Sequence, residues 1–434
     1  MTAALADQLN AALLAGGAQL GTFAKRARTD PALQAGAAAG MMLRPAILTG
    51  AEHARLGADL TTLTGLLAAL PQRLFGGDVD AMAEALGFPA VQRAAIEATW
   101  PDEVRLSRTD LMRTAEGFQA VEVNLHSSLG GLDSGPWHRA YLGVPAFADF
   151  AAEHRLSYLD PLDGVAGALR SAARRHGLGA FPRVALVDWP TSYPKVEARL
   201  HRLARLLSAR GFSAFACHAG QLGLRDGRLH AEGRPIDIVY RIFVLEHVSQ
   251  QPGLLAPLLA AHRSGAALLV MGFGAELLGN KGTLALLSAN ADSFSPAERA
   301  AVHRLVPWTR FLHAEHLADA VAQREDLILK PVGGYGARGI VAGWAVTDAA
   351  WRAALMDAVG EPWILQRRVR AIPERVPLLT GDGVTLGEVD VNWGAFVVDD
   401  RYSGMMIRAV PTGDTALIST ATGALIGGCF SDRA

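Results

Sequence analysis

The stretch Asp326–Trp344 reads DLILKPVGGYGARGIVAGW and joins two short apolar runs by a glycine-rich turn. The runs Leu327–Leu329 and Ile340–Val346 both predict strands. Lys330 closes the first strand, and the turn contains Gly333, Gly334, Gly336 and Gly339. Glycine lets backbone N–H groups approach an anion closely. The pattern is typical of a flap that covers the phosphates of ATP, and an ordinary glycine-rich hairpin remains the alternative.

Two nucleotide-binding motifs are imitated but not completed. Gly334–Gly339 fits GxGxxG, yet β-branched residues follow where a dinucleotide fingerprint requires a helix. Gly274–Thr283 is close to the P-loop pattern, but Asn280 separates Gly279 from Lys281. We base no prediction on either motif.

The composition indicates two or three domains without a strong net charge. The chain has 434 residues, with 41 Lys+Arg against 42 Asp+Glu, so we expect neither nucleic acid nor an anionic membrane as a partner. Two cysteines, Cys217 and Cys429, are too few for a disulfide framework and fit a reducing compartment. Asp7 lies early, and charged residues interrupt the apolar region Gly253–Gly279. We therefore expect a cytoplasmic protein without a secretory signal or a membrane span.

An alternating hairpin carries the most informative polar residues. Val104–Asp110 and Phe118–Asn124 alternate like two strands, with Glu116-Gly117 as the turn. The alternation predicts one shared face that carries Arg108, Asp110, Glu122 and Asn124. Two carboxylates and an amide oxygen are hard ligands suited to Mg²⁺, and an arginine beside them can hold a phosphate. A polar hairpin that faces solvent has the same pattern.

Strands and helices alternate in the middle of the chain. Arg183–Asp188 and Ile236–Tyr240 predict strands, and Lys195–Ala209 predicts an amphipathic helix between them. This alternation predicts a parallel, doubly wound sheet. The arginines of that helix, Arg199, Arg202 and Arg205, fit a solvated face better than a binding patch. His313 and His316 lie three residues apart without an HExxH frame, so we do not expect a metal there.

The order of these motifs resembles that of circularly permuted ATP-grasp ligases, and in particular the synthetase part of the glutathionylspermidine synthetase group. Arg108-x-Asp110 is followed twelve residues after Asp110 by Glu122-x-Asn124, then by the Rossmann-like unit, and then by Lys281 and Lys330. The closing stretch GAFVVDDRYSGMMIRA is similar to the final hairpin of that family. The resemblance covers about residues 100–430. The loop 126–131 differs from that of the polyamine ligases, so polyamine and glutathione substrates are not implied.

The resemblance implies an α/β chain with a circularly permuted ATP-grasp fold and an inserted small Rossmann-like domain. It divides the chain into residues 1–150, with N-terminal helices and metal-binding strands, residues 151–275, with the Rossmann-like domain, and residues 276–434, with the ATP-binding lysines, glycine flap and closing hairpin. It also implies an ATP-dependent carboxylate–amine ligase that acts through an acyl phosphate and releases ADP and phosphate. The substrates would be a small-molecule or peptide carboxylate and an amine, and an oligomer is possible.

The resemblance assigns roles to residues that match the family's motifs. Catalytic roles fall to Arg108 and Arg408. The Mg²⁺ ligands would be Asp110, Glu122 and Asn124. The ATP-binding residues would be Lys281, Lys330, Gly333, Gly334, Tyr335, Gly336, Gln366 and Val369. Substrate contacts would come from Ser127 and Ser128.

Three alternatives remain open from the sequence. Glu388, Asp390 and Asn392 also place three oxygen side chains on one strand face, as the metal ligands of an unpermuted ATP-grasp protein would be placed. A kinase that transfers phosphate to a hydroxyl would need the same nucleotide site. A non-catalytic nucleotide-binding partner is the third alternative, although it would have no need of the complete set on the hairpin.

Overall fold

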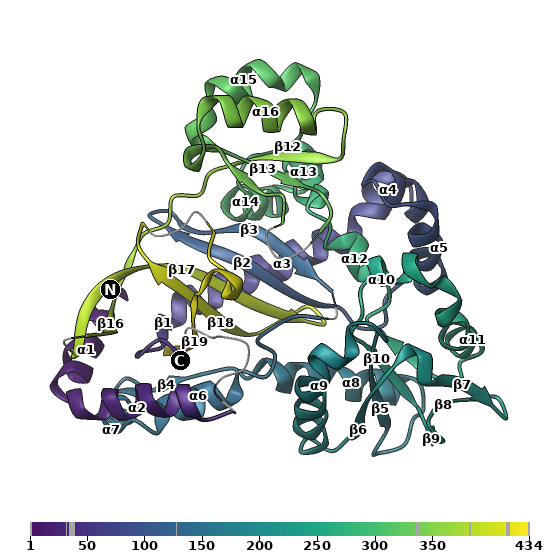
Figure 1. The fold of residues 1–434 in the computed structure, drawn as a ribbon, viewed down its shortest axis with the longest axis horizontal. Coiled ribbons are helices and arrows are strands. Elements are labelled where there is room, and N and C mark those ends of the chain that lie inside the picture. The colour runs from purple at the N-terminus through teal and green to yellow at the C-terminus, as the bar shows by residue number, and fades with distance from the viewer. Residues whose placement is uncertain are drawn as a thin grey trace.

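The computed structural model describes residues 2–31, 33, 40–126, 128–334, 338–381, 383–413 and 417–432. Figure 1 shows a central sheet, a lobe above it that contains α15 and α16, and a unit at the lower right that contains β5 and β10. The α/β class predicted from the sequence is confirmed. The domain boundaries remain predictions, although the central sheet takes strands from both ends of the chain.

The central sheet has eight strands, in the order β1-β19-β18-β17-β2-β3, with β16 paired to β17 and β4 paired to β19. Its strands are β1 (Ala46–Leu48), β2 (Leu106–Thr114), β3 (Gly117–Leu125), β4 (Leu156–Ser157), β16 (Glu374–Thr380), β17 (Gly383–Val398), β18 (Arg401–Pro411) and β19 (Leu425–Asp432). The hairpin predicted around Glu116-Gly117 is confirmed as β2 and β3. The sequence indicated that the hairpin of β17 and β18 is the last element of the fold. This prediction was wrong, because β19 follows the hairpin and pairs with β18.

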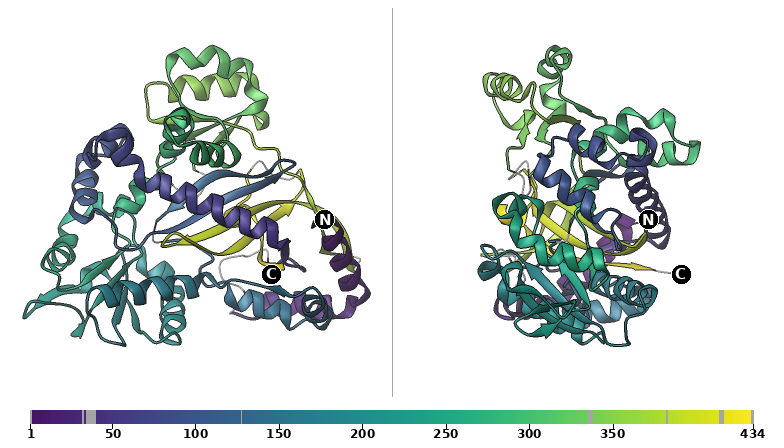
Figure 2. Two further views of the ribbon diagram at one scale, coloured as in Figure 1. Left: turned by 180° about the vertical axis from the view of Figure 1, so that it is seen from behind. Right: turned by 90° about the vertical axis from the view of Figure 1, so that its right-hand side faces the viewer.

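Helices cover the back of this sheet, as Figure 2 shows for α3. Thr49 starts α3 with a capping box, in which its side chain accepts from Glu52 N and Glu52 accepts from Thr49 N. Alanine- and leucine-rich segments form the helices of the N-terminal region, as predicted. These are α1 (Thr2–Ala15), α2 (Gly17–Thr29), α3 (Gly50–Phe75), α4 (Val79–Ala85), α5 (Ala90–Thr99), α6 (Gly135–Leu142) and α7 (Pro145–Glu153).

The predicted parallel sheet is also confirmed, with strand order β11-β10-β5-β6. Its strands are β5 (Arg183–Asp188), β6 (Ser213–His218), β10 (Ile238–Arg241) and β11 (Leu268–Val270), and its helices are α8 (Pro161–Arg175), α9 (Tyr193–Ser208), α10 (Leu245–Gln250) and α11 (Ala256–Ser264). A small three-stranded sheet adjoins it, formed by β7 (Leu222–Arg225), β8 (Arg228–Ala231) and β9 (Arg234–Pro235). Burial of β5 and β10 on both faces explains their nearly unbroken apolar sequences.

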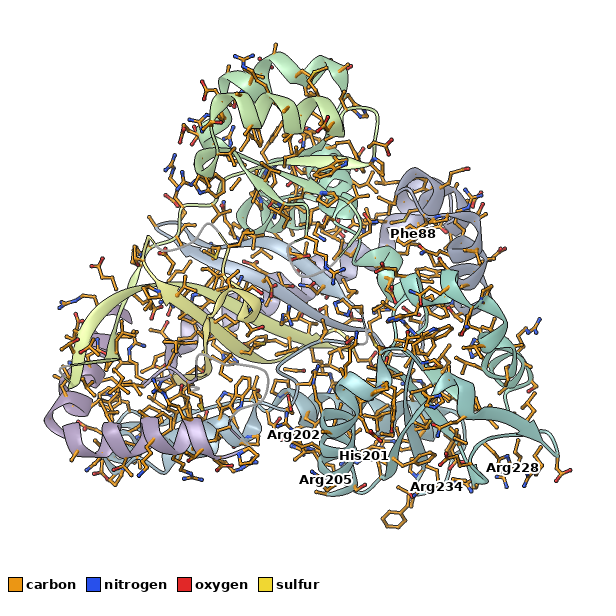
Figure 3. The ribbon with its side chains drawn as sticks, viewed as in Figure 1. Phe88, His201, Arg202, Arg205, Arg228 and Arg234 are labelled. Atoms are coloured by element: carbon orange, nitrogen blue, oxygen red, sulfur yellow. The ribbon has the colours of Figure 1, made fainter. Side chains whose placement is uncertain are left out.

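The solvated face expected for the arginines of α9 is confirmed for Arg205 and is wrong for Arg199 and Arg202. Arg199 donates a hydrogen bond from Nη2 to Leu129 O at 2.9 Å, and Arg202 forms an ion pair with Asp133. Arg205 is exposed, as expected. Figure 3 shows Arg202 and Arg205 on the outer part of this unit. The sequence could not predict the first two contacts because their partners lie about seventy residues earlier in the chain.

The upper lobe contains an antiparallel sheet in the order β12-β15-β13-β14. Its strands are β12 (Thr309–Phe311), β13 (Leu327–Pro331), β14 (Val341–Ala342) and β15 (Trp363–Arg367), and the helices that follow the parallel sheet are α12 (Gly274–Leu278), α13 (Gly282–Ala289), α14 (Pro296–Leu305), α15 (Leu317–Ala322) and α16 (Asp348–Ala358). The hairpin predicted on either side of the glycine turn is therefore present.

The second strand of that hairpin is shorter than the apolar run 340–346 indicated. Gly343–Ala345 turns into a single 3₁₀ turn. The carbonyls of Gly343 and Val346 both accept hydrogen bonds from Arg324 Nη1, at 2.6 and 2.5 Å. A side chain at Gly343 would meet the Arg324 carbonyl at 2.1 Å, so this close approach requires glycine. Among the described residues, no helix is both long enough and apolar enough to cross a bilayer.

Candidate active site

A cavity of about 480 Å³ lies between the central sheet and the upper lobe. Its floor is the β2–β3 hairpin with β17 and β18, and its roof comes from β13, β15 and the segment after β15. Charged side chains from both lobes line it: Arg108, Asp110, Glu122, Lys330, Arg367, Arg368, Arg370, Asp390 and Arg408. Six of these nine are cationic at neutral pH, so the cavity favours a ligand with several negative charges.

The pairing of β2 with β3 explains why one face of the hairpin collects the polar residues. Arg108 lies opposite Asn124, and Asp110 lies opposite Glu122. Successive side chains of a strand point to opposite faces, so these two pairs share a face. The register shifts immediately after Asp110, between Asp110 and Leu111. The predicted four-residue set is therefore brought together.

Asp110 is the centre of a buried network of hydrogen bonds. Its Oδ1 accepts from Arg108 Nε at 2.8 Å and lies 2.7 Å from Arg408 Nη2, while its Oδ2 accepts from Asn124 Nδ2 at 3.2 Å. Burial alone would raise the pKa of Asp110, but the two guanidinium groups hold that pKa well below its usual range. Burial acts to lower the pKa of Arg108, and the charge of Asp110 more than offsets it. Both groups are ionised at neutral pH.

Two lysines reach from the upper part of the chain to β3. Lys330, at the end of β13, donates from Nζ to Val121 O at 2.9 Å and to Gln366 Oε1 at 2.7 Å. Lys281, just before α13, lies with Nζ 3.1 Å from Glu122 Oε1 and donates to Gly334 O at 2.8 Å. Burial lowers the pKa of Lys330 to about 8. Residues 49 positions apart in the sequence, 281 and 330, thus contact adjacent residues of one strand.

A second cavity of about 310 Å³ continues from the first. Glu122 and Asn124 line both cavities, while Lys281, Gly333, Gly334 and the imidazole of His126 line only the second of them. Burial, with a further contribution from the charge of Arg108, lowers the pKa of His126 to about 3, so this ring is neutral at physiological pH. Gly334 has φ +84°, a conformation that favours glycine.

The hairpin residues fit a hydrated Mg²⁺ ion. Carboxylates of Asp110 and Glu122 and the amide of Asn124 face one cavity, and Mg²⁺ is bound by a few such oxygens together with water and substrate phosphates. Asn124 donates its Nδ2 to Asp110, so its Oδ1 is the atom left for a metal. Nowhere in the described ranges do three or more His, Cys, Asp or Glu side chains form a metal-binding group. The site would therefore depend on the amide and on ligand oxygens.

The alternative strand contributes to the same cavity. Asp390 and Asn392 line it, because β17 pairs with β2 on one side and with β18 on the other. Asn392 Oδ1 accepts from Arg408 Nη2 at 2.8 Å. Glu388 is exposed and does not line the cavity. The sequence treated the residues of the hairpin and those of β17 as rival metal sites. The sheet instead places Asp390 and Asn392 of β17 in the same cavity as the hairpin residues.

The remaining predicted residues fall in several places. Gln366 and Val369 line the first cavity, and Gln366 Nε2 also donates to Thr309 Oγ1 at 3.2 Å. Ser128 lines a different cavity, which it shares with His126. Three predicted residues, Ser127, Tyr335 and Gly336, lie outside the described part of the chain.

Sequence reasoning missed several residues that line these cavities. His126 follows the metal motif closely but has no partner pattern of its own. Arg368, Arg370 and the segment Leu417–Ser419 line the first cavity from loops far apart in the sequence. Only the cluster of arginines after Gln366 was a usable signal, since it directly follows Gln366, which the sequence already placed among the ATP-binding residues.

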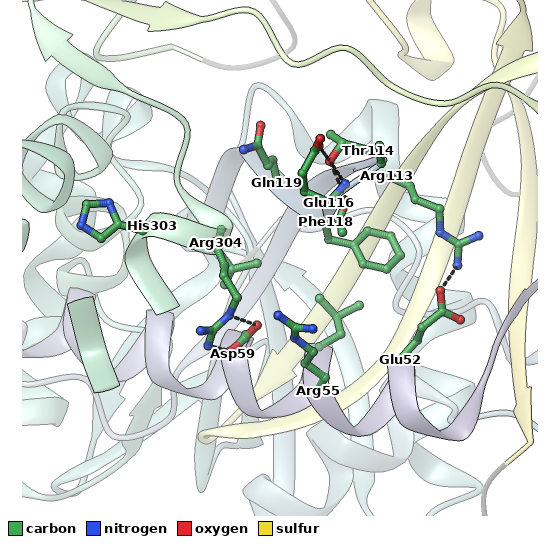
Figure 4. A pocket seen from close by; sticks show the side chains of 14 residues that line it. Glu52, Arg55, Asp59, Arg113, Thr114, Glu116, Phe118, Gln119, His303 and Arg304 are labelled. Atoms are coloured by element: carbon green, nitrogen blue, oxygen red, sulfur yellow. Dashed lines mark hydrogen bonds and ion pairs between the residues drawn. The ribbon is translucent and has the colours of Figure 1, made fainter. Parts of the chain in front are cut away.

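Another cavity of about 480 Å³ lies at the tip of the hairpin, between α3 and α14. None of the predicted site residues lines it. Two of its arginines are held in ion pairs, which Figure 4 marks: Arg113 Nη2 lies 3.1 Å from Glu52 Oε1, and Arg304 Nη2 lies 2.5 Å from Asp59 Oδ1. We therefore place the candidate active site in the cavity around Asp110 rather than here.

Comparison with known proteins gives a shared fold. No protein-family model and no curated protein matches the sequence. A solved structure of a glutathione synthetase-like effector from Globodera pallida, in its apo form, matches with a TM-score of 0.57 and 12% identity over 90% of this chain and 89% of that chain.

Two further structures match over part of the chain. A D-alanyl-alanine synthetase A from Vibrio cholerae has a TM-score of 0.30 and 14% identity, covering 49% of this chain and 68% of that one. A RimK domain ATP-grasp protein from Sphaerobacter thermophilus has a TM-score of 0.29 and 18% identity, covering 58% and 92%. Of these three structures, the effector alone has a TM-score above 0.5, and at 12% identity it shows a shared fold. Circular permutation stays a prediction.

The network around Asp110 predicts unequal effects of two substitutions on stability. Asp110→Ala leaves two buried guanidinium groups without their shared carboxylate, so we expect a loss of about 3–5 kcal/mol in the free energy of unfolding. Glu122→Ala should cost about 1 kcal/mol, because Lys281 keeps its hydrogen bond to Gly334 and the Glu122 side chain is 25% exposed. Urea unfolding of both variants measures the difference. Equal, small losses would contradict the network described above.

Proposed function

We propose that this protein is an ATP-dependent carboxylate–amine ligase that works through an acyl phosphate. The observation that carries the proposal is the convergence of Lys281, Lys330, Arg108 and Arg408 on one strand pair that also presents carboxylate and amide oxygens. Cations from two lobes around oxygen ligands suit a nucleotide triphosphate with its metal. The fold shared with a glutathione synthetase-like effector agrees with a ligase.

The residues divide the work of binding ATP. Lys281 and Lys330 would hold phosphates as point charges, since the ammonium group of each contacts β3, which forms part of the cavity floor. Gln366 and the backbone near Val369 would hold the base, because they line the part of the cavity formed by β15 and the loop after it. Gly333 and Gly334 lie beside Lys281, where the glycine turn would close over the terminal phosphate.

The chemistry would then take place above Asp110. A substrate carboxylate oxygen attacks the γ-phosphorus of ATP, the bond to ADP breaks, and an acyl phosphate forms. An amine nitrogen attacks the acyl carbon, phosphate leaves, and an amide remains. Arg108, held by Asp110, would neutralise the transferring group, a role worth roughly 10³–10⁵ in rate for an arginine. Bound Mg²⁺ would supply further charge neutralisation between the phosphates.

A kinase is the second candidate, because it would use the same nucleotide site. The ligase is favoured by a further cavity at the ends of the strands of the parallel sheet. This cavity offers a place for an additional substrate. An acyl phosphate also hydrolyses readily and needs a site that excludes water. Arg108 and Asp110 are both largely buried.

Trapping with hydroxylamine tests the ligase directly. Amino acids, short peptides and other small carboxylates are each supplied with ATP, Mg²⁺ and hydroxylamine. We expect at least one acid to give a hydroxamate together with ADP and phosphate, because hydroxylamine captures an acyl phosphate in place of the amine. Release of AMP and pyrophosphate, or accumulation of a phosphorylated alcohol, would contradict the proposal.

Two variants on the same hairpin provide the control for this experiment. Glu122→Ala removes a proposed metal ligand and should abolish hydroxamate formation while the protein stays folded. Glu116→Ala changes an exposed carboxylate at the turn and should leave the rate unchanged. If Glu122→Ala keeps full activity and Asp390→Ala loses it, the metal belongs to β17 instead.

The pKa of Lys330 predicts how nucleotide affinity depends on pH. The Lys330 amine is protonated below about pH 8 and binds phosphate in that form, so nucleotide affinity should fall as the pH rises through 8. The protonated fraction drops about tenfold for each further pH unit. Calorimetry with a non-hydrolysable ATP analogue and Mg²⁺ measures the dissociation constant across this range.

Substitution to arginine tests whether Lys330 is responsible for the pH dependence. Lys330→Arg keeps its charge at all these pH values, so its profile should be flat. Lys195→Arg, at an exposed position of α9, should keep the wild-type profile. A wild-type profile that is flat through pH 8 would show that Lys330 does not contact the phosphates.

A further inference from the structure

A cavity of about 280 Å³ lies in the parallel-sheet unit, close to the loop that follows β3. Its walls are the end of β5, the segment after β10, one side of α9, and the loop that contains His126 and Ser128. Figure 1 shows β5, β10 and α9 next to each other in the lower right of the molecule. The cavity is separate from the site around Asp110, with which it shares no lining residue.

This cavity lies at the edge of the parallel sheet at which α/β proteins commonly bind ligands. The strand order is β11-β10-β5-β6, so the chain continues from β5 to β6 on one side and later returns to β10 on the other. This reversal is a switch point, and ligands bind outside the carboxyl ends of the strands there. Asp188 is the last residue of β5, and Ile242 follows the last residue of β10. Both line the cavity.

The lining combines one carboxylate and one guanidinium group with walls that are mostly aliphatic. Asp188 is 3% exposed, and burial raises the pKa of its carboxyl group, although hydrogen bonds from the Trp189 backbone and the Ser192 side chain act against that rise. Arg199 donates one N–H to Leu129 O, and a guanidinium group has five N–H donors. Aliphatic side chains form most of the remaining walls: Leu129, Leu132, Val196, Leu200, Leu203, Ile242 and Val244. Four neutral or titratable polar side chains complete the lining: His126, Ser128, Ser192 and His247. Opposite charges within an apolar cavity match a small zwitterion with an apolar side chain.

His126 connects this cavity with the proposed transfer site. The residue lines both this cavity and the one that contains Lys281, Glu122 and Gly334. It stands two positions after Asn124, at the end of the β2–β3 hairpin. A molecule held by Asp188 and Arg199 would therefore lie next to the second cavity, which meets the first cavity at Glu122 and Asn124.

We propose that this cavity binds an amino acid with an apolar side chain, or the corresponding end of a short peptide, as a substrate. Asp188 would hold the ammonium group, Arg199 the carboxylate, and the aliphatic walls the side chain. The role as a substrate rests on the proposed ligase function, whereas the binding itself does not.

Three probes separate the two charged contacts. L-leucine carries both groups, isoamylamine has the same carbon chain without the carboxylate, and isocaproate has it without the ammonium group. Calorimetry is carried out on the whole protein, with and without a non-hydrolysable ATP analogue and Mg²⁺. We expect L-leucine to bind more tightly than either of the other two.

Substitutions at the two charged residues should divide the probes. Asp188→Asn should weaken L-leucine and isoamylamine by about tenfold or more and leave isocaproate unchanged, because a hydrogen bond to a charged group is worth about 1.5–3 kcal/mol. Arg199→Gln should weaken L-leucine and isocaproate and leave isoamylamine unchanged. Arg205→Gln, at an exposed position of the same helix, should leave all three unchanged.

The outcomes distinguish this inference from the ligase proposal. Retained binding of isocaproate by Asp188→Asn also shows that this variant is folded. Absence of binding by all three probes, or equal effects of both substitutions on all three, would overturn the inference even if hydroxamates form. The expected division of the probes without any ATP-dependent turnover would support the cavity as an amino-acid site and reject the ligase.

Discussion

Contact of two lysines with a single strand defines the region of the candidate active site. Lys330 donates to the carbonyl of Val121, and Lys281 pairs with Glu122, the next residue of β3. These contacts bring the upper lobe over the central sheet and form the cavity between them. Both ammonium groups are largely buried, which is costly unless a partner is present. Loss of β3 would therefore remove the partners of both lysines together with two of the three proposed metal ligands, Glu122 and Asn124.

The surplus of positive charge in the cavity gives this arrangement its chemical direction. Asp110 is shared between Arg108 and Arg408, so one carboxylate balances two guanidinium groups. Arginines on the segment after β15 add to the imbalance. A buried excess of cations is stabilised when an anion enters, and in the proposed reaction the same interactions would position that anion for transfer. Binding of a polyphosphate and catalysis would thus draw on one set of charges.

The sequence predicted the elements and the local sets of residues better than their assembly. Alternation in β2 and β3 was enough to place Arg108, Asp110, Glu122 and Asn124 on one face, because strand periodicity is local. The pairing of β17 with β2 was not predictable from spacing, and it brings Asp390 and Asn392 into the same cavity. The contacts of Arg199 with Leu129 and of Lys281 with Glu122 were likewise missed or unspecified, since they join segments from different parts of the chain.

Transfer of a heavy oxygen isotope tests the central claim most directly. The acid that gives a hydroxamate is labelled in its carboxylate group, and the phosphate released with the natural amine is analysed by mass spectrometry. An acyl phosphate retains one carboxylate oxygen on phosphorus when the amine displaces it. The account predicts one labelled oxygen in each phosphate released. Unlabelled phosphate, with the whole label left in the acid and the amide, would contradict it.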